Sequence, residues 1–196
     1  MKKRELERRL LACGWRFLRH GSRHDVWTDG EGEEYVPRHA EVNETAGPGN
    51  SAKGVQGTDM RFAGKLVRDG RWWLAEIPML DALTQGRTRR EALEMVKDWL
   101  ETAVNRSDFH ATVHEKGRAE FEVSGSDATS LIALLLRRRR AASGASLRDM
   151  ATRLGATSRN AYARYERGEA APTLEKLDAL LKATSPGGDF VIRETQ

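Results

Sequence analysis

The chain has 196 residues, enough for one domain or for two or three small ones. Hydrophobic residues make up 39% and charged residues 32%, as in soluble globular proteins, and no apolar run approaches the roughly 20 residues of a membrane span. The single cysteine, Cys13, excludes an internal disulfide, and the first residues are charged throughout, unlike a secretory signal. We therefore expect a cytoplasmic protein with no membrane partner.

The first 40 residues predict one helix followed by three strands. Leucines at helical spacing favour a helix over 2–13, which Gly14 can end, and Cys13 is expected in the core between helix and sheet. The strands are expected at 15–18, 24–28 and 34–36. Asp29-Gly30-Glu31-Gly32 predicts a hairpin turn between the last two.

Residues 41–59 lose the hydrophobic pattern and are rich in Gly, Pro, Asn and Ser, which predicts a flexible linker. Met60 follows directly and begins a clear strand pattern, as the start codon of a second gene would. Our interpretation is that two neighbouring reading frames were fused.

The pattern after Met60 predicts strands and one long helix. The strands are expected at 61–67, 72–77, 82–85, 110–114 and 119–123, with the helix ending near 104. Thr88 and Glu91 form a capping box, in which each side chain binds a backbone N–H at the helix start. Asp127 can cap a further helix through 131–136.

Residues 147–168 predict two short helices joined by a tight turn. Met150 and Leu154 lie on one apolar stripe, Gly155 supplies the turn, and Tyr162 faces inward from the second helix. The side chains left to face outward are Ser158, Arg159, Asn160 and Arg164. Arg and Asn are the residues that read guanine and adenine edges in the major groove, so the pattern favours a DNA-binding helix-turn-helix. The alternative is an ordinary αα-hairpin with a solvated arginine face.

Positive charge is concentrated in the same region. Residues 131–168 contain nine arginines and two acidic residues, a net charge of +7, whereas the whole chain carries +4. Neutralisation of phosphates by Lys and Arg supplies most non-specific affinity for DNA. The run Arg137, Arg138, Arg139 and Arg140 is therefore a candidate phosphate contact.

The segment RLGATSRNAYARYERGEAAPTLEKLDALLKA resembles the helix-turn-helix of Xre and Cro/cI repressors, with its ERG turn and a following helix opened by Pro172-Thr173. This resemblance implies operator DNA as a partner.

The amino-terminal elements resemble the HicA family of toxins. The matching residues are Gly14-Trp15, Gly21-Ser22-Arg23-His24 and Val36-Pro37-Arg38-His39. The resemblance implies a fold like that of double-stranded-RNA-binding domains and metal-independent cleavage of mRNA, with His24 as the catalytic residue.

Histidine suits this chemistry, because it can move a proton to or from the 2′-hydroxyl or the leaving oxygen near neutral pH. The cations Lys2, Lys3, Arg23 and Arg38 are candidates for holding the RNA phosphate. Without the motif, His24 would be interpreted as a surface histidine on a strand. His20 and His24 have the spacing of a helical metal pair, but Gly21-Ser22 indicates a loop, so no metal or cofactor is expected.

HicA proteins close their fold with a second helix, and this chain has the linker at that point. A unit of about 40 residues buries little core. We expect its uncovered sheet face to pack against the rest of this protein or against a second copy.

Residues 60–184 resemble HicB antitoxins. The resemblance lies in 62–67, 73–77, Ala82-Leu83-Thr84-Gln85-Gly86, Glu91-Ala92 and the helix-turn-helix. It implies a partial RNase H-like ββ(β)αβ domain without the acidic metal site, which binds and blocks the toxin. It also implies that the DNA-binding part represses its own operon, usually as a dimer.

These patterns together predict an α+β protein with three folded parts. The boundaries are a toxin-like αβββ domain at 1–40, the linker at 41–59, an RNase H-like domain at 60–126, an all-α helix-turn-helix domain at 127–184, and a tail at 185–196 with a possible edge strand at 190–193. The expected function is a toxin–antitoxin fusion, neutralised in cis, that acts as an autorepressor and as a homodimer or higher oligomer. The alternatives are an mRNA endoribonuclease released by linker cleavage and a plain DNA-binding regulator.

Overall fold

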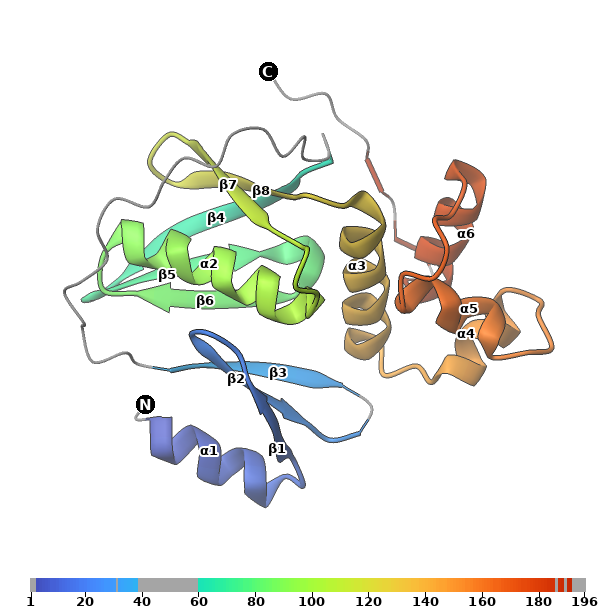
Figure 1. The fold of residues 1–196 in the computed structure, drawn as a ribbon, viewed down its shortest axis with the longest axis horizontal. Helices are drawn as coiled ribbons and strands as arrows, with labels where there is room; N and C mark the ends of the chain where they lie inside the picture. Colours follow the sequence, from blue (N-terminus) through green and yellow to red (C-terminus); the bar gives the residue numbers. More distant parts are fainter. Residues whose placement is uncertain (1–2, 31, 39–59, 186, 189, 192–196) are drawn as a thin grey trace. The chain divides into compact units, whose positions relative to one another are not determined.

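The structure is a computed structural model that describes residues 3–30, 32–38, 60–185, 187–188 and 190–191 (Figure 1). The predicted linker at 41–59 and Lys2 lie outside the described residues. The chain forms two compact units, Met1–Leu131 and Ile132–Gln196. None of the helices among the described residues is long and apolar enough to cross a membrane.

The first unit begins with one helix and a three-stranded antiparallel sheet of order β1-β2-β3. The elements are α1 (Lys3–Ala12), β1 (Arg16–His20), β2 (His24–Thr28) and β3 (Glu33–Pro37). The predicted order is therefore confirmed. Cys13 is exposed, so its expected place in the core was wrong.

A second, five-stranded antiparallel sheet has the order β6-β5-β4-β8-β7. Its strands are β4 (Phe62–Asp69), β5 (Trp72–Ile77), β6 (Ala82–Gly86), β7 (Ala111–Lys116) and β8 (Glu120–Gly125). The helix α2 (Arg89–Val104) connects β6 to β7 and packs against the sheet.

Local sequence explains these elements. Phe62, Gly64 and Leu66 alternate with exposed residues along β4, so one face is buried. Gly64 is required because a Cβ there would overlap the ring of Phe121. Thr88 caps α2 by accepting from the Glu91 amide, but Glu91 in return binds the amide of Arg87, so the predicted capping box is only half formed.

The helix α2 lies between the two sheets of the first unit. It contacts β5, β6 and β7 on one side and β2 and β3 on the other (Figure 1). All five residues of β2 are buried, and the rings of Tyr35 and Trp99 meet edge to face, 5.3 Å apart. The face of the three-stranded sheet that was expected to need a cover is thus covered by this chain's own α2.

The second unit is helical. Its elements are α3 (Ala128–Ala142), which starts in the first unit, α4 (Leu147–Arg153), α5 (Asn160–Glu166) and α6 (Leu174–Thr184). Asp127 caps α3 as predicted, accepting from the Ser130 amide at 2.9 Å. Tyr162 is fully buried and donates its hydroxyl to the carbonyl of Leu136 at 3.0 Å. In the predicted tail strand, 190–191 are in no strand and 192–193 lie outside the described residues.

Candidate nucleic-acid interfaces

The loop that joins β1 to β2 presents three donors to one carboxylate on α2. The amide of Arg23 donates to Asp98 Oδ1 at 3.1 Å and to Oδ2 at 3.2 Å. The hydroxyl of Ser22 donates to Oδ1, and Nδ1 of His24 bonds to Oδ2. Three consecutive residues of the toxin-like part thus bind one side chain of the antitoxin-like part.

His24 is fully buried at this contact. Its Nε2 has no hydrogen-bond partner among the described residues, and Asp98 is 7% exposed. Burial raises the pKa of Asp98, but the bonds from His24 and Ser22 and the charge of His24 outweigh it, so the pKa of the carboxyl lies below its ordinary value. The contact therefore favours an ionised Asp98 facing the imidazole.

Two further contacts extend the site along the same face of α2. Arg23 pairs with Glu94 at 3.1 Å, and Arg19 donates to the carbonyl of Thr102 at 2.8 Å. Glu94, Asp98 and Thr102 are four residues apart, so they form one stripe of the helix. At Gly21 a Cβ would overlap the Thr102 side chain, so only glycine lets the loop approach α2 this closely. We call Glu94, Asp98 and Thr102 the α2 stripe.

The other residues assigned to RNA are placed differently. Arg38 donates to the carbonyls of Gly21 and Ser22, and its Nε lies 3.5 Å from Asp25, so it holds the loop in shape. Lys2 and the side chain of Lys3 lie outside the described residues. His20 binds Asp25 through Nδ1 at 2.7 Å, so the two histidines at metal-pair spacing face different carboxylates.

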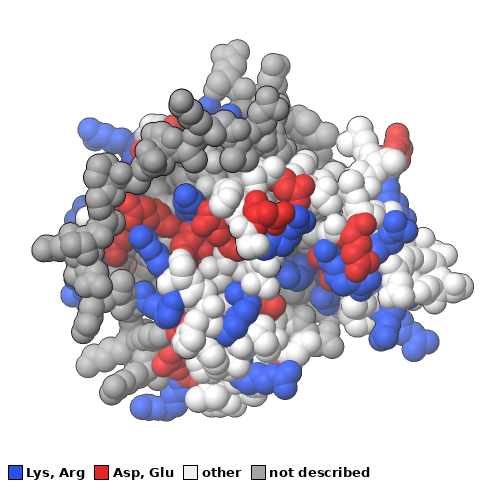
Figure 2. All heavy atoms as spheres, in the orientation of Figure 1, with Lys and Arg blue, Asp and Glu red and all other residues white. Residues whose placement is uncertain are grey.

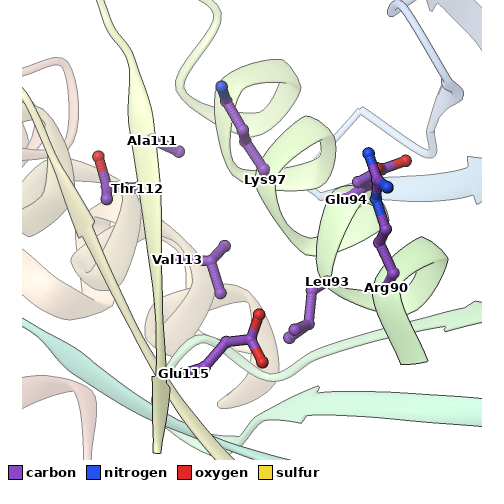
Figure 3. A pocket seen from close by; sticks show the side chains of 8 residues that line it. All are labelled: Arg90, Leu93, Glu94, Lys97, Ala111, Thr112, Val113 and Glu115. Atoms are coloured by element: carbon purple, nitrogen blue, oxygen red, sulfur yellow. The ribbon is translucent and has the colours of Figure 1, made fainter. Parts of the chain in front are cut away.

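A groove of about 360 Å³ borders the α2 stripe, between α2 and the edge strand β7 (Figure 3). Its lining residues are Arg90, Leu93, Glu94, Lys97, Ala111, Thr112, Val113 and Glu115. Arg90 pairs with Glu94 at 3.0 Å, so charges of both signs line it. The face in Figure 2 likewise carries acidic and basic side chains interspersed, as expected for a chain with a net charge of +4.

In the helical unit, the four residues predicted to face outward are all exposed. They are Ser158, Arg159, Asn160 and Arg164. Asn160 opens α5, and Ser158 accepts from its amide at 3.3 Å, while Arg159 occupies the capping position without a side-chain cap. Gly155, with φ of +67°, makes the turn between α4 and α5. The second helix thus presents a polar, arginine-bearing end.

Comparison with known families matches residues 136–185 to a helix-turn-helix family. Residues 136–185 are an Xre-type helix-turn-helix domain. The match indicates a DNA-binding transcriptional regulator, and it accounts for about a quarter of the chain. A comparison with curated proteins found no match.

The arginine run reaches into this helix-turn-helix domain along α3. Arg137, Arg138 and Arg139 are half-buried, and the guanidinium of Arg139 lies 5.3 Å from the ring of Phe190. Arg140 is buried: it pairs with Glu166 at 2.7 Å and donates to the carbonyl of Ala145 at 3.0 Å. Its assignment as a phosphate contact is therefore corrected, because this side chain holds the core of the domain together.

Sequence reasoning missed Asp98, Glu94 and Ser22. A signal was present, because the α2 segment carries a carboxylate at 98 between apolar residues on both sides along the chain. A charged residue on an otherwise buried face needs a partner, and the loop supplies it.

Proposed function

We propose that the chain is a DNA-binding autorepressor in which the antitoxin-like part, 60–126, holds the toxin-like part, 1–40, inactive in cis. The observation that supports this most is the burial of His24 against Asp98. The HicA resemblance implies His24 as the catalytic residue, and a fully buried imidazole bonded to a carboxylate is out of reach of RNA. A tether of about 20 residues raises the effective concentration to about the millimolar range, so inhibition is close to permanent.

The helix-turn-helix domain supplies the second half of this proposal. We propose that Ser158, Arg159, Asn160 and Arg164 contact base edges and that Arg137, Arg138 and Arg139 contact phosphates. We further propose that the protein binds as a homodimer or a higher oligomer. A dimer of this motif reads a two-fold symmetric operator with half-sites about one helical turn apart, and we expect such a sequence upstream of the gene.

Alanine at Arg159 or Asn160 should weaken operator binding about 10-fold to 100-fold, because each lost base contact removes about 1–3 kcal/mol of discrimination. Arg137→Ala should weaken operator and unrelated DNA alike and lower the salt slope by about one. The matched control is Arg118→Ala, an exposed arginine of the first unit. Fluorescence anisotropy at several salt concentrations measures all four. Equal affinity of the Arg159 and Asn160 variants and the wild type for the operator would refute the assignment.

Asp98→Ala in the full chain should cleave a long mRNA that the wild-type chain leaves intact, because the loss of its carboxylate frees His24. The double variant Asp98→Ala/His24→Ala should be inactive, and Lys97→Ala, an exposed neighbour on α2, should behave as the wild type. If none of them cleaves, the toxin-like part is inert and the protein is a plain DNA-binding regulator. If the wild-type chain cleaves only after proteolysis between 41 and 59, it is a conditionally released endoribonuclease.

A further inference from the structure

The bonds to Asp98 form an anion-binding arrangement. Ser22, Arg23 and His24 contribute a hydroxyl, a backbone amide and an imidazole, and all three converge on the same carboxylate. Each carboxylate oxygen receives two of these contacts, since the amide lies near both. Converging donors of this kind are the chemistry with which proteins bind phosphate groups.

The donors are held in place by contacts that do not involve α2. The amide of Gly21 donates to the carbonyl of His24 at 2.7 Å, and the amide of Arg38 donates to the carbonyl of Arg23 at 2.6 Å. The guanidinium of Arg38 binds the carbonyls of Gly21 and Ser22. The toxin-like part therefore shapes the loop by itself, and the three donors keep their positions when the carboxylate is withdrawn.

A second observation also points to an absent group. Nε2 of His24 is fully buried and has no hydrogen-bond partner among the described residues, which costs free energy in the closed arrangement. A carboxylate has two oxygens and can satisfy only one imidazole nitrogen here. A phosphate group has more acceptor oxygens, and nucleotides add hydroxyls.

We propose that the loop from Gly21 to His24 is a phosphate-binding site, and that the Asp98 carboxylate occupies it in place of a phosphate group. This rests on the proposed cis inhibition and names the chemistry that the inhibited site binds. Ser22 and the Arg23 amide are then phosphate-positioning groups beside His24. The helix α2 and a phosphate compete for the same donors, so they cannot be bound together.

Titration of the full-length chain with inorganic phosphate tests this directly. The readout is the ¹⁵N shift of the His24 ring nitrogens, which reports this loop separately from the DNA-binding domain. Asp98→Ala should bind phosphate at least about tenfold more tightly than the wild type, because no built-in carboxylate competes. Asp98→Ala/Ser22→Ala should lose about tenfold of that affinity, and Lys97→Ala should match the wild type.

A second arm replaces inorganic phosphate with a short single-stranded oligoribonucleotide and, in parallel, with the matching oligodeoxyribonucleotide. A response to phosphate alone or to either oligonucleotide supports a phosphate site, and the comparison tells which source it prefers. Asp98→Asn keeps the side-chain volume and provides a second variant if the alanine variant fails to fold. An unchanged His24 signal in a folded Asp98 variant at every phosphate concentration overturns the inference.

This outcome is separable from the proposed function. Phosphate binding without mRNA cleavage by Asp98→Ala leaves the site standing and removes the ribonuclease. Cleavage by Asp98→Ala without any effect of Ser22→Ala or of added phosphate removes the site and leaves the ribonuclease.

Discussion

Replacing Glu166 by alanine should destabilise the helix-turn-helix domain by about 3–5 kcal/mol, because the buried guanidinium of Arg140 then has no carboxylate. Both side chains of this pair are 8% exposed, so water cannot replace the lost partner. A small domain has only about 5–15 kcal/mol of stability in total, so the domain becomes marginal and DNA binding falls with it.

The chain itself provides two spectroscopic signals for this experiment. All five tryptophans lie in the first unit, at positions 15, 27, 72, 73 and 99, whereas the second unit is helical. In a urea titration, Glu166→Ala should move part of the circular dichroism transition to lower denaturant and leave the tryptophan transition in place. The matched control is Glu169→Ala, whose exposed pair with Arg167 should contribute less than about 1 kcal/mol. Equal transitions for the two variants would contradict a core role for Arg140.

Asp98→Ala should release the toxin-like part from α2, again at a cost of about 3–5 kcal/mol, because it leaves the buried His24 without its anionic partner. The contacts of Arg23 with Glu94 and of Arg19 with Thr102 remain, but they lie at the rim and are partly exposed. A protease site placed between 48 and 54 separates the two parts without touching a described residue. After cleavage, the wild-type fragments should elute together in gel filtration, and the Asp98→Ala fragments should separate.

The same cleaved protein should show a dependence on pH. The pKa of Asp98 is lower in the docked state than its ordinary value of 3.8, so ionisation stabilises docking. This contribution is fully present above about pH 4 and is lost as the pH falls through the lowered pKa. Asp98→Asn should remove that acid dependence, and Lys97→Ala should keep it. Fragments of Asp98→Asn that stay together and part at the same acidic pH as wild type would show that another group controls docking.

The elements of both sheets could be predicted from the sequence, because strand alternation and turn glycines are local signals. The turn at 29–32 and the apolar alternation of β4 are examples. The site could not be assembled in the same way, because Asp98 lies 74 residues from His24 and no local pattern pairs them. Only the apolar surroundings of Asp98 indicated that it needed a partner.

The arginine run shows a different limit. Four identical residues give no sign of which one turns inward, and the charge argument treats them alike. Helical spacing does distinguish them: Leu136 is fully buried, and Arg140, four residues later, continues the same face. Reading the run by position on the helix would have separated Arg140 from the phosphate contacts.

The position of α2 between two sheets has a consequence for how this protein can change over evolutionary time. One helix serves as the covering layer of both sheets, so a substitution in it must satisfy two cores at once. The outer strands β1 and β6 each answer to one sheet only. The α2 segment should therefore drift most slowly among relatives of this chain, and the toxin-like part cannot become independent again without acquiring a helix of its own.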